Sequence, residues 1–211
     1  MNVVFFGDSI CVGQYVSPHL IWISKIASRL NEAFPAGGIL VVNSSINGDT
    51  TRMALERVAV DVQRYNPEVL VVQFGINDSN FWDTDNGVPR VQKRAFEANL
   101  HEIFARGRNF GAKKIILNTN HPTNKPLPLQ NINHSVGNAA YNDLIRRVAA
   151  DDGQVKLIDI ERVFQQRIEA GTELDELLLP DGIHLSLSGH QLYYDTVCPV
   201  MEHSLGELGA N

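Results

Sequence analysis

The chain alternates short, mostly apolar runs with longer segments whose apolar residues recur at helical spacing. The five apolar runs span residues 3–6, 39–42, 69–74, 115–117 and 155–158. Runs of this length without polar alternation are typical of strands buried on both faces of a parallel sheet. Helices between successive strands are the connections that parallel pairing requires. The sequence therefore predicts an α/β fold, a three-layer α/β/α sandwich with a mostly parallel five-stranded sheet.

Apolar residues between these runs recur every three or four positions, which predicts amphipathic helices. We expect helices over about 19–34, 51–65, 96–110, 136–148, from the fifth strand to about 170, and from about 188 onward. No repeat, low-complexity tract or interdomain linker interrupts this order. We therefore expect residues 1–211 to form a single domain.

Charge and cysteine content narrow the possible partners. The formal net charge of -6, without a visible basic stripe, disfavours a nucleic-acid partner. The apolar runs are too short to span a bilayer, so no stable membrane association is expected. Cys11 and Cys198 are the only cysteines, too few for a disulfide scaffold. A cytoplasmic protein is the simplest interpretation; a secreted protein with its leader removed stays open, as does the oligomeric state.

The polar residues that follow the first strand stand at a position suited to chemistry. Gly7 ends the strand, and Asp8 and Ser9 come next. Ligands of open α/β sheets bind outside the carboxyl ends of the strands, so a hydroxyl at this position is placed to react. The structural alternative is that Asp8 or Ser9 caps a following helix.

Further polar residues should reach the same edge of the sheet. Gly48 follows the second strand, Asn77 follows the third, and Asp181 and His184 lie in a loop before the last helix. Acyl transfer needs a nucleophile, a base, a carboxylate that orients the base, and donors for an oxyanion. Together with Ser9, these residues can supply all four.

Four short blocks resemble those of the GDSL, or SGNH, hydrolase family. They are Gly7-Asp8-Ser9-Ile10, with isoleucine where the name-giving leucine would stand, Gly48 within residues 46–50, Gly75-Ile76-Asn77-Asp78, and Asp181-Gly182-Ile183-His184. The blocks occur in the family's order and span nearly the whole chain. One block alone would be weak evidence, but four on a predicted parallel sheet identify the chain as a member.

This resemblance implies a flavodoxin-like SGNH fold and a serine hydrolase. Ser9 would be the nucleophile, His184 the general base and acid, and Asp181 its orienting carboxylate. The backbone N–H groups of Ser9 and Gly48 and the side chain of Asn77 would form the oxyanion hole. No cofactor is expected. The spacing of the histidines does not favour a metal site.

The substrate pocket should come from the loops at 10–18, 79–89 and 119–135. Trp82 could stack on a sugar or cover an acyl chain, although packing over its own loop would explain it equally well. His121 could contact a polar substrate or belong to a structural turn.

Asparagine-rich loops without a long apolar groove favour a small acyl group. The leading hypothesis is an esterase that releases a short acyl group, most simply acetyl, from a carbohydrate hydroxyl. A lysophospholipase or thioesterase for longer chains and an O-acyltransferase share the same site. A catalytically silent binding domain on this fold is the non-enzyme alternative.

Overall fold

The computed structural model describes residues 1–125 and 133–210. Its sheet has five parallel strands in the order β2-β1-β3-β4-β5. The strands are β1 (Asn2–Gly7), β2 (Leu40–Asn43), β3 (Val69–Gln73), β4 (Lys114–Asn118) and β5 (Val155–Ile158). This is the flavodoxin-like strand order, with the switch point between β1 and β3. The predicted α/β class and the parallel sheet are confirmed.

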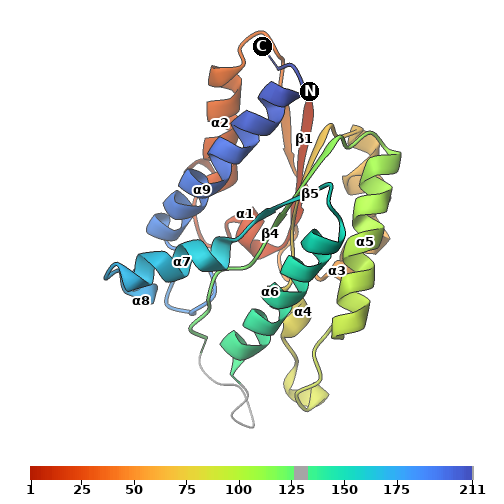
Figure 1. Cartoon of the computed structure of the whole chain (residues 1–211). Coiled ribbons are helices and arrows are strands. Elements are labelled where there is room, and N and C mark those ends of the chain that lie inside the picture. The colour runs from red at the N-terminus through yellow and green to blue at the C-terminus, as the bar shows by residue number, and fades with distance from the viewer. Residues whose placement is uncertain (126–132, 211) are drawn as a thin grey trace.

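Helices cover both faces of the sheet (Figure 1). They are α1 (Ser9–Val12), α2 (Trp22–Ala33), α3 (Thr51–Asp61), α4 (Ile76–Ser79), α5 (Lys93–Asn109), α6 (His134–Asp151), α7 (Ile160–Glu169), α8 (Leu174–Leu177) and α9 (Leu187–Glu207). Helices α2, α7 and α9 pack on one face, and α3, α5 and α6 pack on the other.

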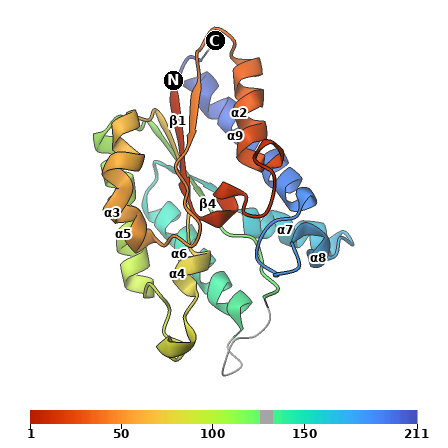
Figure 2. The same ribbon diagram turned by 180° about the vertical axis from the view of Figure 1, so that it is seen from behind.

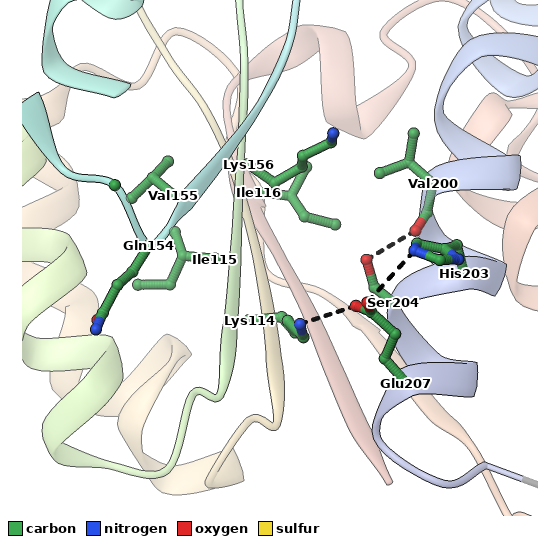
Figure 3. Close-up of a pocket in the computed structure, with 11 residues that line it drawn as sticks. Lys114, Ile115, Ile116, Gln154, Val155, Lys156, Val200, His203, Ser204 and Glu207 are labelled. Atoms are coloured by element: carbon green, nitrogen blue, oxygen red, sulfur yellow. Dashed lines mark hydrogen bonds and ion pairs between the residues drawn. The ribbon is translucent and has the colours of Figure 1, made fainter. Parts of the chain in front are cut away.

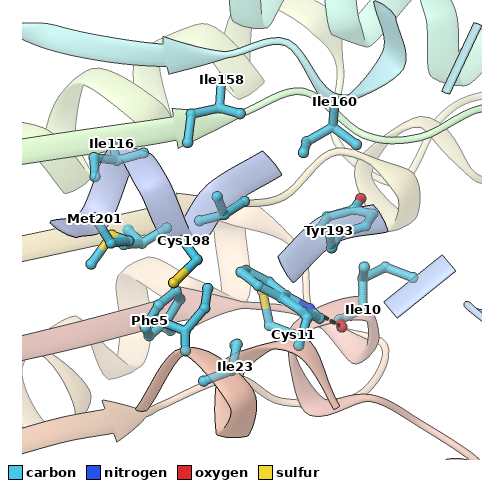
Figure 4. Close-up of a cluster of buried hydrophobic side chains, with 14 of the residues drawn as sticks. Phe5, Ile10, Cys11, Ile23, Ile116, Ile158, Ile160, Tyr193, Cys198 and Met201 are labelled. Atoms are coloured by element: carbon cyan, nitrogen blue, oxygen red, sulfur yellow. Dashed lines mark hydrogen bonds between the residues drawn. The ribbon is translucent and has the colours of Figure 1, made fainter. Parts of the chain in front are cut away.

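Alternation along β1 divides the core between the two faces. Val3 and Phe5 point towards α2 and α9, whereas Val4 and Phe6 point towards α3 and α5. The Phe5 ring meets the Trp22 ring edge-on at 5.4 Å. Figure 4 shows the hydrophobic cluster on the face covered by α2 and α9, in which both cysteines are buried and unpaired.

Two helices are shorter than their sequence periodicity predicts. The helix expected from residue 19 begins at Trp22, because Pro18–Leu20 forms a separate 3₁₀ turn. The helix expected to run to 65 ends at Asp61, and Gln63–Tyr65 is again 3₁₀. Asn66 then takes a left-handed conformation, which closes the segment before Pro67.

The carboxyl ends of the strands form one edge of the sheet, and the polar blocks follow them there. Gly7 pairs with Gln73 at the ends of β1 and β3, so α1 and α4 begin side by side. Figures 1 and 2 place both short helices at this edge, away from the start of β1. The topology thus brings residues near 9, 77 and 184 together.

Candidate active site

Ser9, His184 and Asp181 form a continuous hydrogen-bonded chain. The Ser9 Oγ lies 2.9 Å from His184 Nε2, and His184 Nδ1 lies 2.5 Å from Asp181 Oδ2. An ionised carboxylate only accepts, so Nδ1 carries the proton and Nε2 is left to accept from the serine hydroxyl. The structure therefore brings these three predicted residues together in the arrangement that acyl transfer requires.

The turn that carries His184 is held from within. Asp181 Oδ1 accepts the backbone N–H groups of Ile183 at 3.0 Å and His184 at 2.9 Å. Burial opposes ionisation of Asp181, but the hydrogen bonds from the His184 ring and from these N–H groups outweigh it, so its pKa is lowered. One carboxylate thus shapes the turn and orients the imidazole.

Gly182 makes this turn possible. Its φ is +67°, and a Cβ at this position would lie 2.4 Å from the Asn124 carbonyl oxygen. The Asn124 N–H in turn donates to the Gly182 carbonyl at 2.7 Å. Any side chain at 182 would push the 121–125 segment away from the histidine turn.

Ser9 is the first residue of α1, and Asp8 caps this helix by accepting the Ile10 N–H at 3.0 Å. The structural role expected for Asp8 is therefore present. Asp8 does more, because its second carboxyl oxygen lies 3.3 Å from Asn77 Nδ2. Complete burial raises the pKa of Asp8 to about 7, and nearby Asp78 adds to the effect.

Asn77 lies on α4, which follows β3, and Gly48 lies in the loop that follows β2. Because β1 lies between β2 and β3 in the sheet, these two residues flank Asp8 at the end of β1. The Arg90 guanidinium donates to the Gly48 carbonyl at 3.0 Å. Asp78 accepts both the backbone N–H and the hydroxyl of Thr51, at 2.9 and 2.5 Å, which ties α4 to the start of α3. These contacts position the two expected oxyanion donors; their catalytic roles stay predictions.

Arg57 is a structural residue of this edge that the sequence patterns did not indicate. Its guanidinium binds Asp49 Oδ2 at 2.5 Å, donates to the carbonyls of Ser44 and Gly7, and lies 4.4 Å from the centre of the Phe6 ring. One side chain therefore fixes the end of β1 against the loop that carries Gly48. Only its position one helical turn before Asp61 on α3 could have suggested a paired role.

The structure revises the expectation for His121. This residue is fully buried, and Tyr193 Oη lies 2.8 Å from its Nδ1, while the Ile183 carbonyl lies 2.7 Å from its Nε2. Since a carbonyl only accepts, Nε2 carries the proton and Nδ1 accepts from the tyrosine. Burial lowers the pKa of His121 to about 4, which keeps the ring neutral. The predicted substrate contact is thus out of reach, and His121 instead supports the residue before His184.

A buried chain of hydrogen bonds continues behind His121. Gln73 Nε2 donates to Tyr193 Oη, and Asn118 Nδ2 donates to Gln73 Oε1, both at 2.9 Å. The ends of β3 and β4 are therefore connected through Tyr193 to the histidine turn.

Trp82, the other expected substrate contact, lies 59% exposed in the loop between α4 and α5. The Arg90 guanidinium, which holds Gly48, is 5.1 Å from the centre of the Trp82 ring. Trp82 is thus linked through Arg90 to the loop that carries Gly48. Of the expected loop at 119–135, residues 126–132 lie outside the described residues.

Two cavities differ in their relation to this site. Figure 3 shows one of about 280 Å³ between the starts of β4 and β5 and the end of α9, at the opposite edge of the sheet. A second, of about 510 Å³, lies beside α4. It is lined mostly by apolar groups, among them Phe81, Val136, Ala140 and Tyr141. Only the second adjoins the element that carries Asn77.

Over residues 1–125 and 133–210, no group of three or more His, Cys, Asp and Glu residues is arranged to hold a metal ion. Within the same ranges, every helix is too short or too polar to cross a bilayer.

Comparison with known proteins identifies the family. The sequence matches the GDSL-like Lipase/Acylhydrolase family over residues 5–192. This chain belongs to that family. The resemblance read from the four blocks is confirmed, and the protein is a carboxylic ester hydrolase.

The individual proteins that this chain resembles are distant in sequence. The mouse isoamyl acetate-hydrolyzing esterase 1 homolog is 27% identical over 98% of this chain and 84% of its own length. The LAE5 hydrolase from the Lake Arreo metagenome is 25% identical, with a TM-score of 0.79 over 97% of this chain and 95% of its own. Axe2, an acetylxylan esterase from Geobacillus stearothermophilus, is 23% identical over 95% and 93%, with a TM-score of 0.76.

Proposed function

We propose that this hydrolase removes short acyl groups, acetyl above all, from hydroxyls of carbohydrates through an acyl-enzyme on Ser9. The observation that carries the proposal is the unbroken chain from Ser9 Oγ through the His184 ring to Asp181. His184 Nε2 takes the serine proton as the hydroxyl attacks the ester carbonyl, and it passes this proton to the departing alcohol. Water then repeats the sequence on the acyl-enzyme.

The oxyanion that develops on the carbonyl needs donors on the side of Ser9 away from His184. The backbone N–H groups of Ser9 and Gly48 and the amide of Asn77 are the groups proposed for this role. Asn77 has two amide protons, so the one not directed at Asp8 is available to the substrate.

The acetyl and carbohydrate assignments rest on two lines of support. The mouse relative is named for hydrolysis of an acetate ester, and Axe2 is named as an acetylxylan esterase. The partly exposed ring of Trp82 next to Arg90 offers a surface on which a sugar can stack.

The experiment compares acetylated xylosides with p-nitrophenyl esters of 2, 4, 8 and 12 carbons. We expect the highest kcat/KM with two-carbon esters, and we expect a fluorophosphonate to label wild type but not Ser9→Ala. A preference for chains of about eight carbons or more would contradict the acetyl assignment.

The apolar cavity beside α4 is the one feature that favours a second candidate. With about 510 Å³ it has room for a medium-length acyl chain, as a lysophospholipase or thioesterase would need. Narrowing it by Ala140→Phe would lower activity on eight-carbon esters and spare acetyl esters if that candidate were right.

A further inference from the structure

Tyr15 occupies a strained position close to the nucleophile. Its φ is +70°, and it is the third residue of a turn closed by the Val16 N–H on the Gly13 carbonyl at 3.0 Å. A positive φ at the third position of a β-turn is normally supplied by glycine or asparagine. A tyrosine there crowds its own backbone, so some other advantage must retain it.

Burial is not that advantage, because 74% of Tyr15 is exposed. Its ring instead stands perpendicular to the ring of His184, with 5.2 Å between the ring centres. The turn is fixed to α1, since the N–H groups of Gly13 and Gln14 both donate to the Ser9 carbonyl, at 3.0 and 3.1 Å. These contacts therefore hold the aromatic ring at a defined position relative to both Ser9 and His184.

The reaction itself determines which part of the substrate Tyr15 meets. His184 Nε2 must deliver its proton to the oxygen of the departing alcohol, so that oxygen has to lie beside the imidazole. The carbonyl oxygen points the other way, towards Asn77 and Gly48. An exposed ring that contacts the imidazole thus borders the alcohol half of the ester.

We propose that Tyr15 is a stacking platform for the leaving alcohol and that this alcohol is a sugar ring. The apolar C–H face of a pyranose packs on an aromatic face, while its hydroxyls stay in water. Asp181, which is hydrogen-bonded to the same imidazole, keeps 36% of its side chain exposed, which leaves the rim polar enough for those hydroxyls. This assignment rests on the proposed function and adds the residue that selects the alcohol.

The test pairs two acetate esters that differ only in the alcohol, a methyl 2-O-acetyl-xylopyranoside and 2-methoxyethyl acetate. Tyr15→Asn removes the ring and suits the left-handed backbone, and Tyr15→Phe keeps the ring. We expect Tyr15→Asn to lower the ratio of kcat/KM between the sugar ester and the acyclic ester about tenfold. Tyr15→Phe should keep most of that ratio.

Stability supplies a second readout. Since asparagine relieves the backbone strain, Tyr15→Asn should raise the Tm by about 2–4 °C while the preference for the sugar falls. Phe110→Ala, an exposed aromatic at the end of α5 and far from the site, is the matched control and should leave the ratio unchanged.

Two outcomes would overturn the proposal. An unchanged ratio in Tyr15→Asn would exclude a role in alcohol selection, and if both esters lost activity equally, the effect would lie on His184. A loss seen with phenyl acetate but not with the xyloside would exclude the sugar. If wild type cleaves neither acetate, the proposed function fails as well; if it cleaves both and the ratio does not move, only the platform fails.

Discussion

Both edges of the sheet carry charged residues, but these residues are exposed at one edge and buried at the other. At the amino edge, Lys114 pairs with Glu207 and His203 lies 3.4 Å from the same carboxylate, all partly exposed around an open cavity (Figure 3). At the carboxyl edge, Asp8 and Asp78 are fully buried, and burial raises their pKa values to about 7 and about 6. Exposed ion pairs contribute little to stability, whereas buried carboxylates cost stability and persist where they position something. Buried carboxyl groups, more than cavity volume, therefore distinguish the edge that carries the proposed active site.

The largest expected effect comes from the nucleophile. Ser9→Ala should lower kcat for acetyl ester hydrolysis about 10⁴-fold or more, because neither of the other two residues of the hydrogen-bonded triad, His184 and Asp181, can replace the serine as nucleophile. Its Tm should stay within about 2 °C of wild type, since only a hydroxyl is lost. Glu207→Gln at the amino edge is the control and should alter neither property. A large loss of activity in the control would contradict the proposal that catalysis takes place at the carboxyl edge alone.

Asn77→Ala should lower kcat by roughly 100–1000-fold, as loss of one oxyanion donor does, with a much smaller change in KM. The substitution also leaves Asp8 Oδ2 without its amide partner. Steady-state kinetics on an acetyl ester give the answer. A rise in KM at unchanged kcat would mean that Asn77 binds the ground state and the transition state equally.

Tyr193→Phe tests the buried support of the histidine turn. The missing hydroxyl would leave Gln73 Nε2 and His121 Nδ1 without partners, at a cost of about 1–3 kcal/mol in the free energy of unfolding. His121 would then hold the Ile183 carbonyl less firmly, so kcat should fall about tenfold at nearly constant KM. Urea unfolding and kinetics on the same sample separate the two effects. Lost stability with full kcat would reduce this network to a packing role.

The smallest effect is a slope of stability with pH. Asp8 keeps its proton up to about pH 7 when folded but releases it near its ordinary pKa of 3.8 when unfolded. At this carboxyl the folded state therefore binds more protons between these values, so Asp8 by itself contributes a fall in the free energy of unfolding as pH rises from about 4 to about 7. Asp8→Asn should remove this contribution, so between pH 4 and pH 7 its free energy of unfolding should fall less, or rise more, than that of wild type, while Asp78 keeps its own contribution below about pH 6. Urea unfolding at pH 4, 5.5, 7 and 8 measures it; identical slopes in both proteins would contradict the buried-charge account of this edge.

The sequence predicted the sheet because each strand is a short apolar run, and all five runs became strands within one or two residues. It also predicted which residues gather at the carboxyl edge, since parallel topology brings loops together regardless of their separation in sequence. Helices α4 and α8 were missed because four residues are too few to show a period, and α1 was foreseen only as the helix that Asp8 or Ser9 would cap.

For His121, the sequence left a substrate contact and a structural turn both open, for a different reason. It stands in a polar, proline-bearing segment, which suggested a surface loop, yet packing of Phe164 and Tyr193 against its ring buries it. The roles of Tyr15 and Arg57 were equally invisible, because a backbone angle and a set of carbonyl partners depend on tertiary structure.

The bracing by Arg57 has a practical consequence for redesign. Because the guanidinium uses several donors and a ring contact at once, a lysine could not reproduce it. The short turn around Tyr15 and the loop around Trp82 take no part in that bracing. Libraries that randomise these two segments while preserving Arg57 could thus be screened for new alcohols and acyl groups, while the contacts that Arg57 makes at the end of β1 stay in place.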